Sequence, residues 1–211
     1  MDKIKTFESF SESEKTFSFS ELPKDIQEII IERERSSIEG NGDDYWSEPI
    51  IEGFHEDMEA LGLTDIEVAY SGFWSQGDGA SFTARVYNAD NKKFITEALG
   101  LKVLDEVAEN LAISIKRISH HYSHEKTIKG YVEVDGDDEV ERDMGTGMII
   151  TINVEDSVEP IEDAVTAWAR SRSKKLYDDL ETAYNEQFKE EHIIEDLEAN
   201  GVEFDESGNR I

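Results

Sequence analysis

The sequence predicts an α+β fold: an antiparallel sheet of about five strands with helices packed on one face, followed by a long C-terminal helical segment. Two observations predict this class. Short segments in the middle of the chain alternate apolar and polar residues, which is typical of strands with one buried face. Longer segments before and after them repeat apolar residues every three or four positions, which is typical of helices. Strands grouped between helices favour the α+β class.

The length of 211 residues is enough for one domain with a sizeable hydrophobic core. Residues 1–15 are polar and rich in serine and glutamate, so we expect them to form a flexible tail. Residues 16–211 carry the periodic segments, and no internal repeat divides them. We therefore expect these residues to form a single α+β domain.

Two helices are predicted in the N-terminal part of the chain. The first follows the alternating segment FSFS, has Pro23 in its first turn and ends at the sequence GNG. The second begins at Ser47, a favourable N-cap residue, carries Pro49 in its first turn and ends before Gly62.

A β-hairpin is predicted next. The segments DIEVAYSGFW and ASFTARVYN alternate apolar and polar residues, as half-buried strands do. The connection SQGDG contains Gly77 and Gly79, and glycine supplies the positive φ angles that a tight loop needs. The hairpin therefore gathers aromatic and polar side chains around one turn.

The rest of the chain contains further segments with helical and with strand patterns. NKKFITEALGLKVLDEVAENLAISI is helical by its period, with a break expected at Gly100. SIKRISHHYS, TIKGYVEVD and GMIITINVE predict three further strands, and the acidic segment GDDEVERDMGTG is expected to be a solvent-exposed loop. Residues 159–201 predict one long helix or two consecutive helices, and VEFDESGNRI predicts a short terminal hairpin.

The net charge of −29 is unevenly distributed along the chain. Residues 1–65 carry 18 acidic and 6 basic side chains, residues 66–130 carry 8 of each, and residues 131–211 carry 24 acidic and 7 basic. A surface this negative repels phosphate backbones, so we expect no direct nucleic-acid binding; a basic surface on another protein is the expected partner. The segment IKRISHH, with lysines following it, is a small basic exception.

Composition excludes some classes of protein. The chain contains no cysteine, which rules out disulfides, thiolate nucleophiles and cysteine-ligated metals. It has no run of 18 apolar residues and no apolar N-terminal segment, so we expect a cytoplasmic location and no membrane association. We expect no cofactor, because the glycines do not open a helix as phosphate-binding loops do. Asp135 begins an acidic stretch, but Val140 and Thr146 occupy positions where a calcium loop needs glycine and glutamate.

The hairpin loop is the first candidate binding site. The ring of Trp74 could stack on a planar ligand while Gln76 and Asp78 bind its polar edge. The alternative is an ordinary turn whose neighbouring aromatic residues fill the core.

The segment SHHYSHE is the second candidate site, since three of the five histidines lie within residues 120–124. On a strand, His120, Tyr122 and His124 would share one face. Together with Asp78, His120 and His124 could form a metal site or an acid–base pair. The alternative is a polar strand with one packed histidine. The two segments give these candidate ligand-binding residues: Phe73, Trp74, Ser75, Gln76, Asp78, His120, Tyr122 and His124.

Four segments are distinctive in combination: FSELPKDIQEIII, YSGFWSQGDGASFTA, ISHHYSHE and EDLEANGVEFDESGNRI. This combination resembles a functionally unassigned family of small proteins encoded by phages and prophages. The resemblance covers residues 16–211, and the hairpin motif SGFWSQGDGASF is its most specific part. It implies a phage origin, a single domain and an accessory role in the host cytoplasm during infection. The acidic insert at residues 135–143 departs from the family pattern.

Two classes of function remain open. The first is a phage-encoded acidic accessory protein that binds a host factor, in host takeover or anti-defence, with its charge mimicking DNA. The second is a small-ligand or nucleotide-binding or sequestering protein, or a hydrolase, with a pocket formed by the SQGDG hairpin and the SHHYSH strand. The sequence favours the first class and a role other than that of an enzyme, because it contains no catalytic motif such as a nucleophile elbow.

Overall fold

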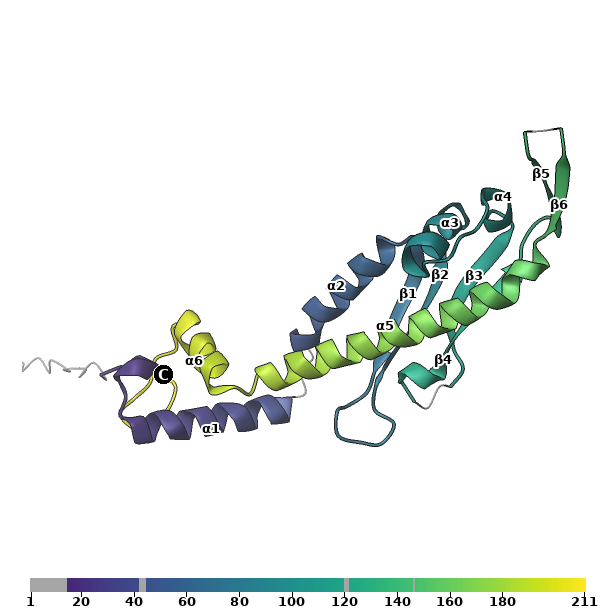
Figure 1. Ribbon diagram of the computed structural model, residues 1–211. Helices are drawn as coiled ribbons and strands as arrows, with labels where there is room; N and C mark the ends of the chain where they lie inside the picture. The colour runs from purple at the N-terminus through teal and green to yellow at the C-terminus, as the bar shows by residue number, and fades with distance from the viewer. Residues whose placement is uncertain (1–14, 42–44, 120–121, 146) are drawn as a thin grey trace, which may run out of the picture. The chain divides into compact units, whose positions relative to one another are not determined.

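The computed structural model describes residues 15–41, 45–119, 122–145 and 147–211. By its internal contacts the chain forms two compact units: unit 1, Met1–Asp43 with Asn185–Ile211, and unit 2, Asp44–Tyr184. Helices combine with antiparallel strands, so the predicted α+β class is confirmed (Figure 1). The sequence predicts one domain over residues 16–211, and most of the predicted tail lies outside the described residues.

Unit 1 is a small helical unit. It contains the 3-10 turn η1 (Phe19–Glu21) and the helices α1 (Lys24–Asn41) and α6 (Glu190–Ala199). Its buried apolar side chains form one cluster: Phe19, Leu22, Ile30, Ile31, Ile193, Leu197 and Phe204. Phe204 also forms isolated β-bridges with Phe17 and Arg210. The predicted terminal hairpin and the predicted FSFS strand are therefore reduced to these single bridges.

Unit 2 is built on a four-stranded antiparallel sheet. Its strands, in spatial order, are β1 (Leu63–Tyr70), β2 (Ala80–Val86), β3 (Leu111–Arg117) and β4 (Ile128–Val134). The predicted hairpin joins β1 to β2, and residues 118–127 join β3 to β4. Because successive strands run in opposite directions, both loops lie at the same end of the sheet.

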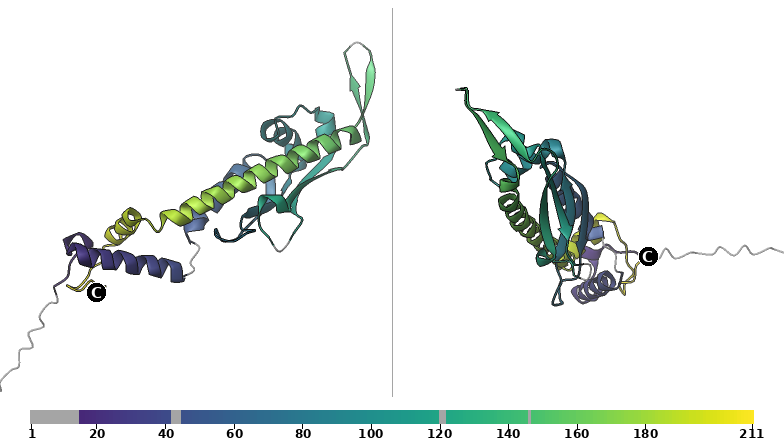
Figure 2. Two further views of the ribbon diagram at one scale, coloured as in Figure 1. Left: turned by 60° about the horizontal axis from the view of Figure 1, so that its bottom comes forward. Right: turned by 90° about the vertical axis from the view of Figure 1, so that its right-hand side faces the viewer.

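One face of the sheet is covered by helices. Alternate residues of β2 and β3 are buried in the core: Phe82, Ala84, Val86, Leu111, Ile113 and Ile115. Helix α5 (Val158–Glu186) packs Val165 and Ala169 into this core, and α2 (Glu48–Glu59) adds Met58. Figure 2 shows α5 lying along the sheet. The predicted packing of helices on one face is confirmed.

Helix α5 also covers the free edge of β4. The backbone N–H of Gly130 donates to Thr166 Oγ1 at 3.0 Å. The backbone N–H of Val132 donates to Glu162 Oε2 at 3.4 Å. Glu162 and Thr166 are separated by about 6 Å along the helix, and Gly130 and Val132 by roughly 6.6 Å along the strand. The two side-chain acceptors are therefore spaced like the two backbone donors. These bonds occupy backbone donors that would otherwise be open to another strand.

The connection between β2 and β3 differs from the predicted helix. It consists of η3 (Asn88–Asp90), α3 (Asn91–Lys93), the π-helical η4 (Phe94–Ala98) and α4 (Asp105–Ala108). The predicted break at Gly100 is present, with a φ of 68°. The predicted helix is wrong from Leu111 onwards, because the alternating apolar residues there are buried as a strand of the sheet.

The acidic segment predicted to be a loop is also partly a strand. β5 (Glu139–Asp143) pairs with β6 (Ile149–Asn153) in a separate two-stranded sheet, here called the ribbon. Figure 1 shows the ribbon extending beyond the end of the four-stranded sheet. The prediction missed β5 because acidic residues are depleted in strands. Three 3-10 turns complete the elements: η2 (Tyr45–Ser47), η5 (Glu125–Thr127) and η6 (Glu155–Ser157).

Candidate functional site

The loop of the β1–β2 hairpin is held by its own aspartate. Asp78 Oδ2 accepts hydrogen bonds from the backbone N–H groups of Trp74, at 2.9 Å, and Ser75, at 2.5 Å. The backbone N–H of Asp78 donates to the carbonyl of Ser75 at 3.1 Å. The carboxylate that the sequence offers as a candidate ligand-binding group therefore also satisfies the backbone of its own loop.

Aromatic residues around this loop line an open pocket of about 520 Å³, here called the aromatic pocket. Its aromatic lining residues are Trp46, Tyr70, Phe73, Trp74 and Tyr184. Phe73 packs against Trp46 and Tyr184, with ring centroids 5.9 and 5.0 Å away. Trp74 is 76% exposed. Trp46, Tyr70 and Tyr184 are not among the residues predicted from the sequence. Tyr70 directly precedes the loop, whereas Trp46 and Tyr184 lie far from it in sequence and carry no local signal of a shared site.

The described residues of the histidine segment lie outside the strands. β3 ends at Arg117, and Tyr122 and His124 belong to no strand, so their predicted alignment on one strand face is wrong. His124 precedes η5, and its Nδ1 accepts a hydrogen bond from the backbone N–H of Lys126 at 3.1 Å. The ring of Tyr122 lies 6.2 Å from that of His124 by centroid. His120 lies outside the described residues.

Two glycines bring the two loops into contact. Gly77 has a φ of 105°, and a Cβ there would lie 2.9 Å from Cδ1 of Tyr122. A Cβ on Gly79 would lie 2.4 Å from Cβ and 2.7 Å from Cα of His124. Both positions therefore need glycine, because a second loop packs directly on them. The structure thus places Tyr122 and His124 beside the SQGDG hairpin.

The polar candidate residues described at the two loops are either exposed or bonded to backbone groups. Within the described part of the chain, no three histidine, aspartate or glutamate side chains are placed to hold one metal ion. Ser75 and Gln76 are exposed at the tip of the loop. The carboxylate of Asp78 and Nδ1 of His124 both accept hydrogen bonds from the backbone.

Carboxylates lie beside the aromatic pocket. The pKa of Tyr177 is raised, first because of its burial and then because of three nearby carboxylates: Glu181, Asp78 and Asp178. Lys174 forms an ion pair with Asp178 at 2.8 Å. The residues that line the pocket carry no charge themselves. An ion pair thus offsets one of the three carboxylates near Tyr177, whose ring lies 5.4 Å by centroid from that of Phe73 in the pocket lining.

Acidic side chains gather at the opposite end of unit 2. The carbonyl of Asn110, which follows α4, accepts the backbone N–H of Asp135 at 2.9 Å. Asn110 Oδ1 accepts the N–H of Asp137 at 2.7 Å. The N–H of Val154 donates to the carbonyl of Asp138 at 2.8 Å. These bonds join segments that contain the following acidic residues, here called the acidic end: Asp105, Glu106, Glu109, Asp135, Asp137, Asp138, Glu139, Glu141, Asp143, Glu155 and Asp156.

The small basic patch is partly neutralised. Lys129 Nζ pairs with Glu162 at 3.0 Å, and this hydrogen bond raises the pKa of Lys129. Lys116 and Lys129 also lie over the ring of Tyr131, at 5.0 and 5.1 Å from its centroid. Glu162 therefore offsets one positive charge of the patch, whereas the ring contact leaves the charge of Lys116 in place.

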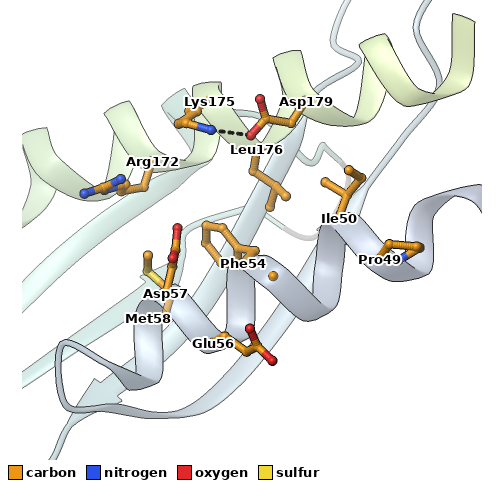
Figure 3. A pocket seen from close by; sticks show the side chains of 11 residues that line it. Pro49, Ile50, Phe54, Glu56, Asp57, Met58, Arg172, Lys175, Leu176 and Asp179 are labelled. Atoms are coloured by element: carbon orange, nitrogen blue, oxygen red, sulfur yellow. Dashed lines mark hydrogen bonds and ion pairs between the residues drawn. The ribbon is translucent and has the colours of Figure 1, made fainter. Parts of the chain in front are cut away.

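Two further hollows are lined by charges of both signs. A groove of about 300 Å³ lies between α2 and α5, where Lys175 pairs with Asp179 at 2.5 Å. Figure 3 shows Phe54 among the side chains that line it. A hollow of about 530 Å³ lies on the open face of the sheet, where Arg85 is 3.9 Å from Asp65. Neither hollow favours a ligand of one charge.

Of the comparisons with known proteins, one matches the chain, over a range that includes most of unit 2. No helix among the described residues is both long enough and apolar enough to cross a membrane. No curated protein and no solved structure matches the chain. One family model, a domain of unknown function (DUF8835), matches residues 46–190, which include both hairpin loops, the ribbon and α5. This match spans well over half of the 211 residues of the chain, and the chain therefore belongs to the DUF8835 family.

Proposed function

We propose that this chain is a phage-encoded accessory protein that binds a basic, nucleic-acid-binding surface of a host protein through the acidic end of unit 2. The resemblance of its sequence to phage and prophage proteins supports the origin. The net charge of −29 supports a basic partner, because opposite charges steer association. Binding there in place of DNA would keep the host protein from its own ligand, in host takeover or anti-defence.

The observation that carries the proposal is the concentration of carboxylates around the ribbon. Residues 133–163 hold 12 acidic side chains and one basic side chain. On β5, Glu139, Glu141 and Asp143 are exposed and share one face. Alternate residues on a strand are separated by roughly 6.6–6.8 Å, so these carboxylates form a regular row. A regular row of negative charges is also what a phosphate backbone presents to a protein.

The ribbon has further features of an interaction element. Among the described residues its two strands pair only with each other, so both edges are open. Met144, Met148 and Ile149 are exposed by 49, 57 and 62% near its turn. Apolar side chains surrounded by polar ones are typical of protein interfaces. A two-stranded sheet is marginally stable by itself, so contact with a partner would stabilise it.

The alternative, a nucleotide pocket formed by both hairpin loops, receives less support. Asp78 and His124 are occupied by backbone donors, which leaves fewer groups to bind a ligand. The carboxylates beside the aromatic pocket would repel the phosphates of a nucleotide.

Affinity capture from an extract of host cells tests the proposal with three forms of the protein. The first is the wild type, and the second carries Glu139→Lys, Glu141→Lys and Asp143→Lys on the ribbon. The control carries the same change of charge on exposed positions of α6: Glu191→Lys, Glu195→Lys and Glu198→Lys.

We expect the wild type and the control to retain the same basic host protein, and the ribbon variant to lose it. Moderate salt and duplex DNA should both release this protein, because the contact is electrostatic and uses a nucleic-acid-binding surface. Equal loss from both variants would contradict a specific role of the ribbon. Retention in the presence of excess DNA would contradict the proposed target surface.

A further inference from the structure

Aromatic rings that pack on one another form one wall of the aromatic pocket. The ring of Tyr184 lies 5.4 Å from that of Trp46 and 5.0 Å from that of Phe73, by centroid. The hydroxyl of Tyr70 bonds to Ser47 Oγ at 3.0 Å. A ligand that enters the pocket would therefore order few side chains, which lowers the entropic cost of binding.

Trp74 is the member of this wall that presents most of its ring to solvent. Its side chain is 76% exposed, although large aromatic rings are on average highly buried. Its backbone N–H bonds to Asp78 Oδ2 at 2.9 Å, which holds this residue at the mouth of the pocket. The faces of indole and phenol rings are electronegative and attract cations.

The charges near the pocket favour a cation over an anion. Three carboxylates lie close to Tyr177: Glu181, Asp78 and Asp178. Lys174 offsets one of them through its ion pair with Asp178. The lining itself offers no positive group to a phosphate or a carboxylate. The pocket therefore suits a planar group that is positively charged.

We propose that the aromatic pocket binds the guanidinium group of an arginine side chain on a partner polypeptide. Guanidinium is planar, permanently charged and more weakly hydrated than ammonium, and it stacks on aromatic rings. Free arginine would bring a carboxylate that nothing in the lining neutralises, whereas an arginine within a chain has none. The inference goes beyond the proposed function and is independent of it, because the pocket and the ribbon lie at opposite ends of the sheet.

Proton–nitrogen NMR of the indole groups tests this inference on the full chain. The protein has three tryptophans, of which Trp46 and Trp74 line the pocket. Trp168 packs against Phe94 in the core of unit 2, so its signal is an internal reference. The probes are N-acetyl-arginine amide, its neutral analogue N-acetyl-citrulline amide, free arginine and adenosine monophosphate.

We expect N-acetyl-arginine amide to shift the signals of Trp46 and Trp74 in a saturable manner, without moving that of Trp168. Free arginine should bind more weakly, and the citrulline and nucleotide probes should produce no saturable shift. Trp74→Ala should lower the affinity for the arginine amide about tenfold. Tyr87→Ala, a variant at an aromatic residue with 63% exposure outside the lining, should leave it unchanged.

Three results would overturn the inference. Equal affinity for the citrulline amide would show that charge is not recognised. Preferential binding of the nucleotide would assign the pocket to a different ligand, and unchanged affinity in Trp74→Ala would place the arginine elsewhere. Each of these results leaves the capture experiment on the ribbon unaffected, so failure of one proposal is distinguishable from failure of the other.

Discussion

The two ends of the four-stranded sheet show two ways of building a binding surface on one scaffold. At the acidic end, carboxylates project from the ribbon and from neighbouring segments, and their side chains are largely exposed. At the loop end, two hairpin loops pack on each other through Gly77 and Gly79, beside a preformed aromatic pocket. Binding at the acidic end should depend mainly on salt, whereas binding at the loop end should depend on individual rings as well as on the charge of the ligand.

The largest expected difference between the ends concerns their glycines. Gly79→Ala should destabilise unit 2 by about 2–3 kcal/mol, because the added Cβ would overlap atoms of His124. Gly145→Ala, in the ribbon turn, meets no atom within 4 Å and should cost only about 1 kcal/mol through its positive φ. Urea unfolding followed by circular dichroism measures both values. Equal costs would show that the ribbon turn is as tightly constrained as the loops.

A smaller effect is expected from the aspartate that holds the hairpin loop. Asp78→Ala should destabilise unit 2 by about 1–2 kcal/mol, because the backbone N–H groups of Trp74 and Ser75 lose their acceptor. Asp78→Asn keeps an acceptor and should cost less. The exposed side chain of Ser75 gives a matched control, since Ser75→Ala should change stability by less than about 0.5 kcal/mol.

Thermal unfolding measures the stability of the Asp78 and Ser75 variants. Fluorescence anisotropy of tryptophan measures the mobility of Trp74 in the loop. A variant Asp78→Ala as stable as the wild type, with unchanged anisotropy, would show that packing against the second loop alone holds the hairpin.

The smallest expected effect is the response of thermal stability to salt, which should depend on the acidic end and not on the aromatic pocket. Raising the salt concentration from about 20 to about 300 mM should raise the unfolding midpoint by about 2–3 °C, because it screens repulsion among the carboxylates. The ribbon variant with three lysines should respond less, and Trp74→Ala should respond as the wild type does. Differential scanning calorimetry measures the midpoints. An equal response of all three forms would mean that the repulsion is spread evenly over the molecule.

Local periodicity predicts much of this fold. The alternating segments of β1, β2, β4 and β6 and the helical period of α2 and α5 identify these elements, because each has one face in the core. Gly100 marks a break in the helical connection, as expected from its effect on helices. The α+β class therefore follows from segments whose pattern and environment agree.

Other features depend on contacts between segments distant in sequence. β5 is acidic and is paired to β6 by five consecutive residue pairs, which strand propensity alone does not predict. The aromatic pocket joins Trp46, Phe73 and Tyr184, which come from three separate elements. The hairpin motif identifies one wall of this pocket, but only the packing of α5 and η2 supplies the others.

Hydrogen exchange of the wild-type protein, alone and in complex with its captured partner, tests whether the acidic end binds a basic host surface. We expect slower exchange on binding in β5, β6 and α4, with the greatest protection in the ribbon, whose open edges should exchange fastest in the free protein. Protection confined to residues 71–79 and 118–127, with none in the ribbon, would contradict it.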